Sequence, residues 1–262
     1  MTVAIDVATE TTVLAGRGLR RFLRSPQLVV YTLALPLLLL FMMLAVFGRI
    51  VGDATHTPYA ARLTPAVVLF ATASGSVVTG VGFFTDLHTG LTDRLRTMPV
   101  SRIAPLLGRI VGDLTRILAA SLVACAVAYL PGFRFHRGPA AAVGFFAVVL
   151  LFATIFLWIA LLIALTAKSE EGVNSALTAP ATLLLFFSSG FVPSNAFPGA
   201  VHPIVAANPL SCATNAAIGL SSGGPLLAPV LQTAAWACAV AAVAAPLTVR
   251  LYHRRGGKPA RR

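Results

Sequence analysis

The stretch GPAAAVGFFAVVLLFATIFLWIALLIALTA, residues 138–167, contains no lysine, arginine, aspartate or glutamate. A helix needs roughly 20 predominantly apolar residues to cross the hydrocarbon core of a bilayer. Uncharged runs long enough for this also cover residues 27–48, 63–85 and 172–249. The sequence therefore predicts an all-α, polytopic membrane protein.

The overall composition excludes a soluble domain. Charged residues make up 11% of this chain, whereas a soluble domain carries about 25%. The net charge is +12, but the basic residues lie in short segments between the apolar runs. This arrangement is typical of membrane proteins and not of a nucleic-acid-binding surface. We therefore expect membrane lipid, and no nucleic acid, as a partner.

Six spanning helices are expected from the apolar runs. They lie at residues 27–47, 64–84, 103–130, 140–166, 173–191 and 226–249. Fourteen basic residues fall in the N-terminal segment, in the connections after the second and fourth spans, and in the C-terminal tail. Four fall on the opposite side. Because basic residues accumulate on the cytoplasmic side, both termini are predicted to be cytoplasmic.

The chain divides into three predicted regions. Residues 1–26 form a cytoplasmic N-terminus, residues 27–249 the transmembrane domain, and residues 250–262 a basic cytoplasmic tail. The N-terminus is expected to carry an amphipathic helix that lies on the membrane surface. The basic residues on one face of that helix are Arg17, Arg20, Arg21 and Arg24.

The stretch 192–224, between the fifth and sixth spans, is uncharged and rich in proline, asparagine and serine. A loop in water would carry more charge, whereas irregular backbone at membrane depth is tolerated when it is buried in protein or lines a cavity. We interpret this stretch as short re-entrant helices. An ordinary extracellular loop is the alternative.

Segment 86–102, between the second and third spans, has an apolar stripe at helical spacing. The stripe consists of Leu87, Leu91, Leu95 and Met98. Pro99 ends the predicted helix, because proline cannot continue the backbone hydrogen bonding. A short cytoplasmic helix of this kind lies on the membrane or docks into the groove of a partner.

Several motifs give the chain a family resemblance. Gly90-Leu-Thr-Asp-Arg-Leu-Arg-Thr-Met-Pro-Val-Ser-Arg102 is followed by Leu106-Leu-Gly-Arg-Ile-Val-Gly-Asp113, and later by Phe187-Ser-Ser-Gly-Phe-Val-Pro193, Phe197-Pro-Gly199 and Asn208-Pro-Leu210. In this order and spacing they resemble the ABC-2 type transporter permeases, in particular the daunorubicin-resistance permeases of actinobacteria. The chain departs from the family at Thr92, near which glutamate is common and only Asp93 is acidic here.

The resemblance implies the permease subunit of an ATP-driven exporter in a bacterial plasma membrane, with amphipathic antibiotics, other drugs or lipids as substrates. Two permeases, forming a homodimer, would pair with two ABC ATPase subunits that bind ATP and magnesium. The permease itself would hold no cofactor, metal or catalytic residue, and the sequence has no phosphate-loop pattern. Segment 86–102 would be the coupling helix that enters a cleft of the ATPase. The residues expected to carry this coupling are Leu87, Leu91, Asp93, Arg94, Leu95, Met98, Pro99, Ser101 and Arg102.

A charged cluster lies within the third span. Arg109, Asp113 and Arg116 occupy helical positions i, i+4 and i+7 and so share one face. A charge at the centre of a span costs roughly 2.5–3.5 kcal/mol on insertion scales, which pairing offsets in part. We interpret the cluster either as a structural ion pair or as an element that transmits motion from the coupling helix. An alternative function is a proton-coupled secondary carrier that uses Asp113, and a third is a membrane scaffold without transport.

The substrate path is expected between the second and fifth spans. Phe83, Ser188 and Ser189 are its candidate residues. Small residues also recur in the second span, at Thr72, Ser76 and Gly80. Such a stripe lets helices approach closely, and a substrate groove is the alternative interpretation.

Overall fold

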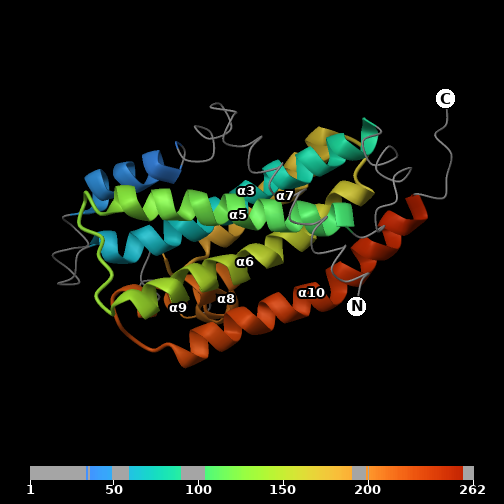
Figure 1. The fold of residues 1–262 in the computed structure, drawn as a ribbon. Coiled ribbons are helices and arrows are strands. Elements are labelled where there is room, and N and C mark those ends of the chain that lie inside the picture. Colours follow the sequence, from blue (N-terminus) through green and yellow to red (C-terminus); the bar gives the residue numbers. More distant parts are fainter. Residues whose placement is uncertain are drawn as a thin grey trace.

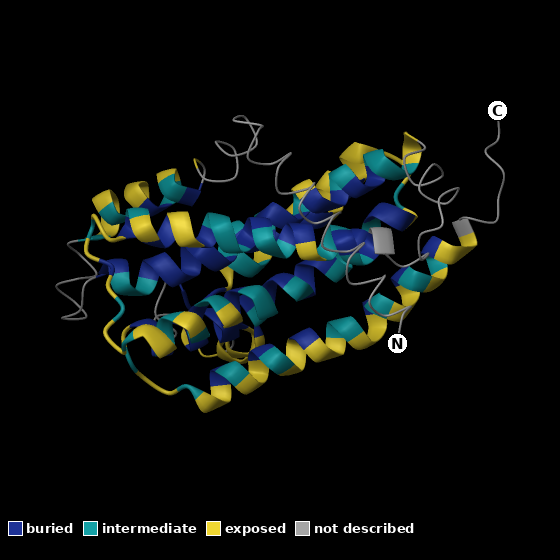
Figure 2. Cartoon of the chain, viewed as in Figure 1, coloured by how far each residue is buried: buried dark blue, intermediate teal, exposed yellow. Residues whose placement is uncertain are grey.

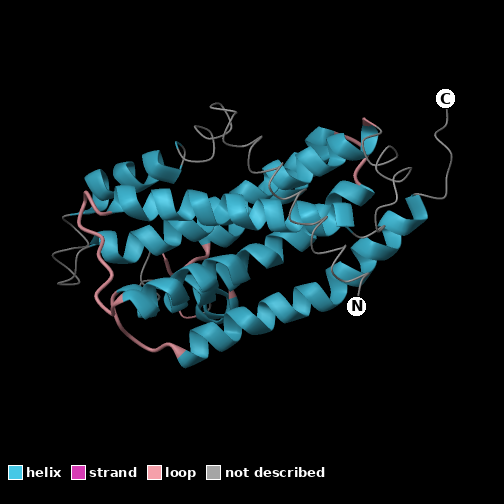
Figure 3. Ribbon diagram, in the orientation of Figure 1, coloured by secondary structure: helices cyan, strands magenta, loops and turns pink. Residues whose placement is uncertain are grey.

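The computed structural model describes residues 34, 36–48, 59–89, 104–190, 199 and 201–255. Within these ranges the chain forms helices and no strand (Figure 3). The helices are Pro36–Gly48, α3 (Tyr59–His88), α5 (Ala104–Ala128), α6 (Pro139–Thr166), α7 (Glu170–Phe186), α8 (His202–Ala207), α9 (Pro209–Ser221) and α10 (Leu227–Arg255). The predicted all-α class is confirmed for this part of the chain.

Four helices are long and apolar enough to cross a bilayer, namely α3, α5, α6 and α10. They correspond to the predicted spans 64–84, 103–130, 140–166 and 226–249. α3 extends beyond its predicted range at both ends and reaches His88. α10 likewise continues to Arg255, so the first residues of the predicted tail are helical. Helices run past the apolar runs because their backbone hydrogen bonds continue into the polar boundary of the membrane, where side chains of either kind are tolerated.

α6 is the central helix of the bundle. It is apolar on every side, and α3, α5, α7, α9 and α10 all contact it (Figure 1). Phe145, Phe152 and Leu161 on α6 are fully enclosed by these neighbours. α6 therefore positions α3 and α5, which carry five of the ten charged residues in the described helices.

Two shorter helices correspond to the remaining predicted spans. The first span, 27–47, is described from Pro36–Gly48 only, and residues 27–33 lie outside the described residues, as does the N-terminal region 1–26. The prediction of 173–191 for the fifth span is wrong at both ends, because α7 runs from Glu170 to Phe186.

Local caps explain the true limits of α7. The backbone N–H of Gly172 donates to Ser169 Oγ at 3.1 Å, so Ser169 is the N-cap. Glu170 and Glu171 follow in the first turn, where negative charge is favoured by the helix dipole. At the other end the backbone leaves the helix at Phe187.

The stretch after α7 contains two short helices, α8 and α9, joined at Asn208. The Asn208 side chain accepts from the N–H of Leu210 at 2.8 Å and donates to the carbonyls of Leu184 and Phe187, both at 2.8 Å. It therefore caps α9 and binds the end of α7 to it. α9 also packs against α3, α6 and α10.

Exposed residues recur along the outer helices of the bundle (Figure 2), and many of them are large and apolar. On helix Pro36–Gly48 and on α10 they include Leu38, Phe41, Met42, Val46, Leu227, Leu231, Val243 and Leu247, each between 42% and 75% exposed. So much exposed apolar surface indicates contact with lipid or with another apolar protein face. The exposure fits the membrane assignment made from hydropathy.

Candidate functional site

Four charged side chains form one connected ion-pair network between α3 and α5. Arg109 Nη1 lies 2.7 Å from Asp86 Oδ2, and Arg109 Nε lies 3.1 Å from Asp113 Oδ2. Arg116 Nε lies 3.3 Å from Asp113 Oδ1. The structure thus brings together the predicted cluster of Arg109, Asp113 and Arg116 and adds Asp86 from the last turn of α3. We call these four residues the α3–α5 network.

Both arginines of the α3–α5 network also bind the backbone or a hydroxyl of α3. Arg109 Nη2 donates to the carbonyl of Thr79 at 3.1 Å. Arg116 Nη2 donates to the carbonyl of Gly75 at 3.1 Å and to Thr79 Oγ1 at 3.3 Å. A helix carbonyl has a second lone pair that can accept such a bond. The network therefore joins the two helices over several turns, not at a single point.

The α3–α5 network is electrically neutral, with two carboxylates and two guanidinium groups. Side-chain exposure falls from 23% for Arg109 and 24% for Asp86 to 11% for Asp113 and 6% for Arg116. Its deeper end is therefore nearly dry, where an unpaired charge costs most. Neutrality and multiple hydrogen bonds explain how α5 carries three charges within a candidate span.

Asp86 is the member of the network that was missed by sequence reasoning, which placed it in segment 86–102. The available signal was charge balance: Arg109, Asp113 and Arg116 sum to +1, so a neutral cluster needs one more carboxylate. The sequence alone does not tell whether Asp86 or Asp93 supplies it. In the structure Asp86 supplies it, because α3 continues one turn beyond its predicted end and places Asp86 beside Arg109.

The last turn of α3 is also bound to α7. Thr85 Oγ1 donates to Glu170 Oε1 at 2.8 Å. The adjacent residue, Asp86, binds α5 through Arg109. His88 is the last residue of the helix, and its ring stacks on that of Phe84, with 4.0 Å between the ring centroids. Two successive residues of α3 therefore connect the end of this helix to two different neighbours.

The predicted coupling residues are described only at the start of the segment. Leu87 belongs to α3 and packs against the core cluster that contains Phe83 and Leu106. The others lie outside the described residues and stay a prediction: Leu91, Asp93, Arg94, Leu95, Met98, Pro99, Ser101 and Arg102.

The three candidate substrate-path residues do not lie together. Phe83 is buried, with its ring 6.2 Å from that of Tyr252 on α10. Ser188 and Ser189 are buried after the end of α7, where Ser189 accepts a hydrogen bond from Arg62 at its carbonyl (2.7 Å). Arg62 and Phe83 lie towards opposite ends of α3. Phe83 is therefore about 30 Å from the two serines that lie beside Arg62. In this arrangement all three residues pack inside a single chain.

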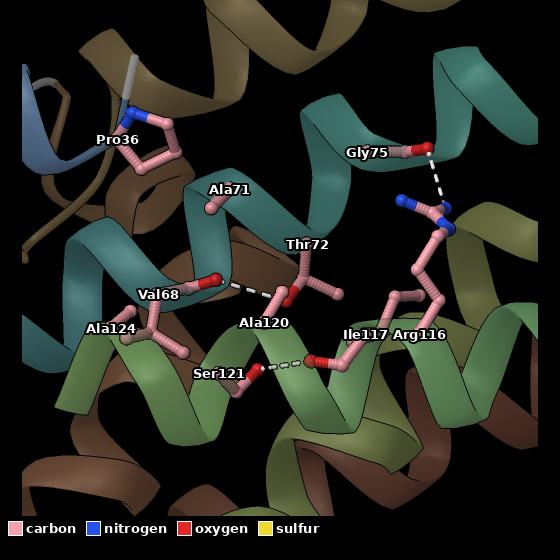
Figure 4. A pocket seen from close by; sticks show the side chains of 10 residues that line it. All are labelled: Pro36, Val68, Ala71, Thr72, Gly75, Arg116, Ile117, Ala120, Ser121 and Ala124. Atoms are coloured by element: carbon pink, nitrogen blue, oxygen red, sulfur yellow. Dashed lines mark hydrogen bonds between the residues drawn. The ribbon is translucent and has the colours of Figure 1, made fainter. Parts of the chain in front are cut away.

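A small cavity of about 20 Å³ lies beside the deep end of the network (Figure 4). It is lined by Pro36, Val68, Ala71, Thr72, Gly75, Arg116, Ile117, Ala120, Ser121 and Ala124. This space has room for about one water molecule. The cavity therefore does not hold a drug-sized compound, and Arg116 lines it while donating a hydrogen bond to the carbonyl of Gly75.

Residues 9–220 match the model of the family described as ABC-2 type transporter. The chain is 30% identical over 244 residues to the probable doxorubicin resistance ABC transporter permease protein DrrC of Mycobacterium tuberculosis, which is 92% of this chain and 87% of that protein. It is 32% identical over 239 residues to the daunorubicin resistance ABC transporter permease protein DrrB1 of Streptomyces coeruleorubidus, or 91% and 84% of the two chains. The matched region includes the whole α3–α5 network.

Proposed function

Because the chain belongs to the ABC-2 type transporter family, we propose that it exports amphipathic or apolar compounds, such as anthracycline antibiotics, from a bacterial cell. It is the permease component of an ABC transporter and is homologous to drug-resistance exporters. Nucleotide binding resides in the partner ATPase of such a transporter, and the permease has no ATPase domain. The observation that carries the substrate class is the similarity to doxorubicin and daunorubicin resistance permeases over more than nine tenths of the chain.

The distribution of charge supports an apolar or amphipathic substrate. In the middle of α3, α5, α6 and α10 the charged side chains all belong to the α3–α5 network, and there they are paired with each other. A path lined by the remaining parts of these helices would offer apolar surface and hydroxyl groups. Such a lining suits a planar, amphipathic compound better than a small hydrophilic ion.

Six spans with both termini in the cytoplasm form the proposed topology, in a bacterial plasma membrane. We assign the first and fifth spans to helix Pro36–Gly48 and to α7, which are both shorter than the four long helices. The end of α3, the start of α5, the end of α6, the start of α7 and the end of α10 lie at one end of the bundle (Figure 1), as this topology requires. α8 and α9 are then re-entrant helices near the outer surface, and the three regions 1–26, 27–249 and 250–262 keep their predicted roles.

The transporter is proposed to contain two permeases and two ATPases, and to work by alternating access. The ATPases push on segment 86–102 when they close around ATP. The start of this segment is the last turn of α3, which is bound to α5 through Asp86 and to α7 through Thr85. Movement of the segment would therefore reach both helices together. Phe83, Ser188 and Ser189 line the substrate path only if their packing changes in another state of the dimer.

Co-purification from native membranes tests the assignment of segment 86–102. The tagged chain is expected to retain an ABC ATPase, and Leu95→Asp with Met98→Asp should abolish this because the apolar stripe would carry two charges. Thr97→Asp is the matched control, since it adds a charge away from the stripe and should leave the ATPase bound. Retention of the ATPase by the double variant would contradict the docking role.

Transport in everted membrane vesicles tests the function itself. Vesicles with the chain and its ATPase should take up doxorubicin when supplied with magnesium and ATP, and vanadate should stop the uptake. Uptake driven by a proton gradient without ATP would support the secondary carrier instead. The structure disfavours that alternative, because both oxygens of Asp113 already accept from arginines.

A further inference from the structure

Arg109 reaches α3 directly above a glycine. A Cβ atom at Gly82 would collide with Arg109 Nη2 and lie 3.4 Å from its Cζ. A second glycine, Gly75, lies two turns earlier on α3 and faces Arg116, which is two turns after Arg109 on α5. The antiparallel helices thus place two glycines against two arginines with the same spacing.

The two glycines differ in how closely the arginine approaches. A Cβ at Gly75 would lie 3.6 Å from Arg116 Nη1 and 3.9 Å from Nη2, which is ordinary van der Waals contact. A Cβ at Gly82 has no such room. A methyl group at position 82 would therefore push the end of the Arg109 side chain away, whereas one at position 75 would fit beside Arg116.

Because Arg109 lies above Gly82, it can bind α3 residues that come before and after this glycine. Thr79, Gly82 and Asp86 are at positions i, i+3 and i+7 of α3 and so share one face. Arg109 Nη2 binds the carbonyl of Thr79 and Nη1 binds Asp86, while Nε binds Asp113 on its own helix. Sliding α5 along α3 by one turn would break both contacts to α3 and bring a side chain larger than glycine beneath the guanidinium.

We propose that Gly82 is a positioning residue that fixes the register of α3 and α5. The inference rests on the proposed function, because segment 90–103 joins these two helices and contains most of the predicted coupling helix. With Arg109 packed against Gly82, a force on this connection moves α3 and α5 together as one rigid hairpin. Without this contact between Arg109 and Gly82, part of the movement would be lost because the two helices would slide along each other.

Gly82→Ala tests the proposal in the complete complex of permease and ATPase. The added methyl displaces the guanidinium of Arg109 but changes no charge. We expect doxorubicin transported per ATP hydrolysed to fall by about tenfold, the upper part of the range for residues that couple two sites, while ATP hydrolysis continues. Gly75→Ala is the matched control, because it adds the same methyl to the same face without a collision, and its coupling ratio should stay near that of the unaltered complex.

A second variant distinguishes a seat for Arg109 from a general need for glycine in α3. Lysine at position 109 keeps the positive charge but has no Nη2 to meet the methyl group, so in the Arg109→Lys background Gly82→Ala should cause little further loss of coupling or membrane abundance. This comparison also serves if Gly82→Ala alone fails to fold. An unchanged coupling ratio in Gly82→Ala, equal losses in Gly75→Ala, or an equally large further loss from Gly82→Ala in the Arg109→Lys background would overturn the proposal. Absence of ATP-driven transport in the unaltered complex would instead refute the proposed function.

Discussion

Asp86 Oδ2 and Arg109 Nη1 are 2.7 Å apart although 23 positions separate the two residues in the sequence. The intervening chain contains most of the predicted coupling segment, so the pair closes a loop at its two ends. One side chain comes from the last turn of α3 and the other from the first turns of α5. A force applied to the loop therefore acts on two helices that are already bound to each other.

Removal of both partners of this pair should destabilise the protein by less than the sum of the two single removals. Asp86→Ala leaves Arg109 with Asp113 as its remaining carboxylate, and Arg109→Met leaves Asp86 without its guanidinium. We expect each single change to lower the free energy of unfolding by about 1–3 kcal/mol, because an incompletely compensated charge remains near the membrane. The double variant should lose less than the sum of the two, as measured by SDS titration in mixed micelles.

Glu171→Ala is the control for the Asp86 series, since this carboxylate is exposed at the start of α7. Its removal should change the unfolding free energy by less than about 0.5 kcal/mol. Strictly additive losses in the Asp86 and Arg109 variants would show that the two side chains do not stabilise each other.

Asp113→Asn should impair transport by about tenfold if the α3–α5 network transmits motion. The amide cannot hold both arginines as the carboxylate does, since only its oxygen accepts hydrogen bonds. The measurement is ATP-driven doxorubicin uptake, normalised to the amount of permease in the membrane. Normal uptake at normal abundance would contradict a functional role, and the network would then be structural only.

Hydropathy predicted the four long helices well because lipid imposes one simple requirement on each of them. A run of about 20 apolar residues satisfies it whatever the neighbours are. The ends of α7 were predicted badly for the opposite reason. Ser169 and Glu170 look like a polar loop, yet they cap and begin the helix. At the far end Asn208 binds the carbonyl of Phe187 from 21 positions away, which no local pattern reveals.

The candidate site could be predicted in part for a related reason. Spacing within one helix places Arg109, Asp113 and Arg116 on one face, and in the structure Asp113 lies within ion-pair distance of both arginines. The contributions of α3 depend on the register between two helices, which spacing in a single sequence does not fix. Asp86, the carbonyl of Thr79 and the closeness of Gly82 therefore emerge only from the structure.

The small residues of α3 are predicted to serve packing. A Cβ at Gly80 would lie 2.7 Å from Leu177 Cδ1 and 3.0 Å from Val173 Cγ1 on α7. Gly80→Ala should therefore lower the free energy of unfolding by about 1–3 kcal/mol through overpacking. Gly48→Ala is the control, because no atom of the described residues lies within 4 Å of the added atom. A changed substrate preference of Gly80→Ala without loss of stability would favour the substrate groove instead.

The proposed topology predicts which positions are reached from outside the cell. In a cysteine-free background, a membrane-impermeant maleimide should label His136→Cys in intact cells and should not label Gly256→Cys, because fourteen of the basic residues lie on the proposed inner side. His136 is exposed in the connection between α5 and α6. Both positions should react after permeabilisation, which controls for reactivity. Labelling of both positions in intact cells would contradict a cytoplasmic C-terminus.

Asn208 should be the most sensitive polar residue in the connection between α7 and α10. It is 5% exposed and makes three hydrogen bonds, two to the end of α7 and one within the first turn of α9. Asn208→Ala should lower the free energy of unfolding by about 1–3 kcal/mol. Asn208→Asp keeps the cap of α9 but places a carboxylate against the carbonyls of Leu184 and Phe187. It should therefore be at least as damaging, although its cap is intact.

Asn174→Ala is the matched control for Asn208, because it removes an amide from an exposed position on α7 whose partner is the exposed Thr178. Its effect should stay within about 0.5 kcal/mol. Thermal and SDS-induced unfolding should be measured for the unaltered chain, Asn208→Ala, Asn208→Asp and Asn174→Ala. The comparison separates the cap of α9 from the hydrogen bonds to α7. If Asn208→Asp is as stable as the unaltered chain, the cap of α9 matters and the bonds to α7 do not. If Asn208→Ala is also unchanged, α8 and α9 are held by packing alone.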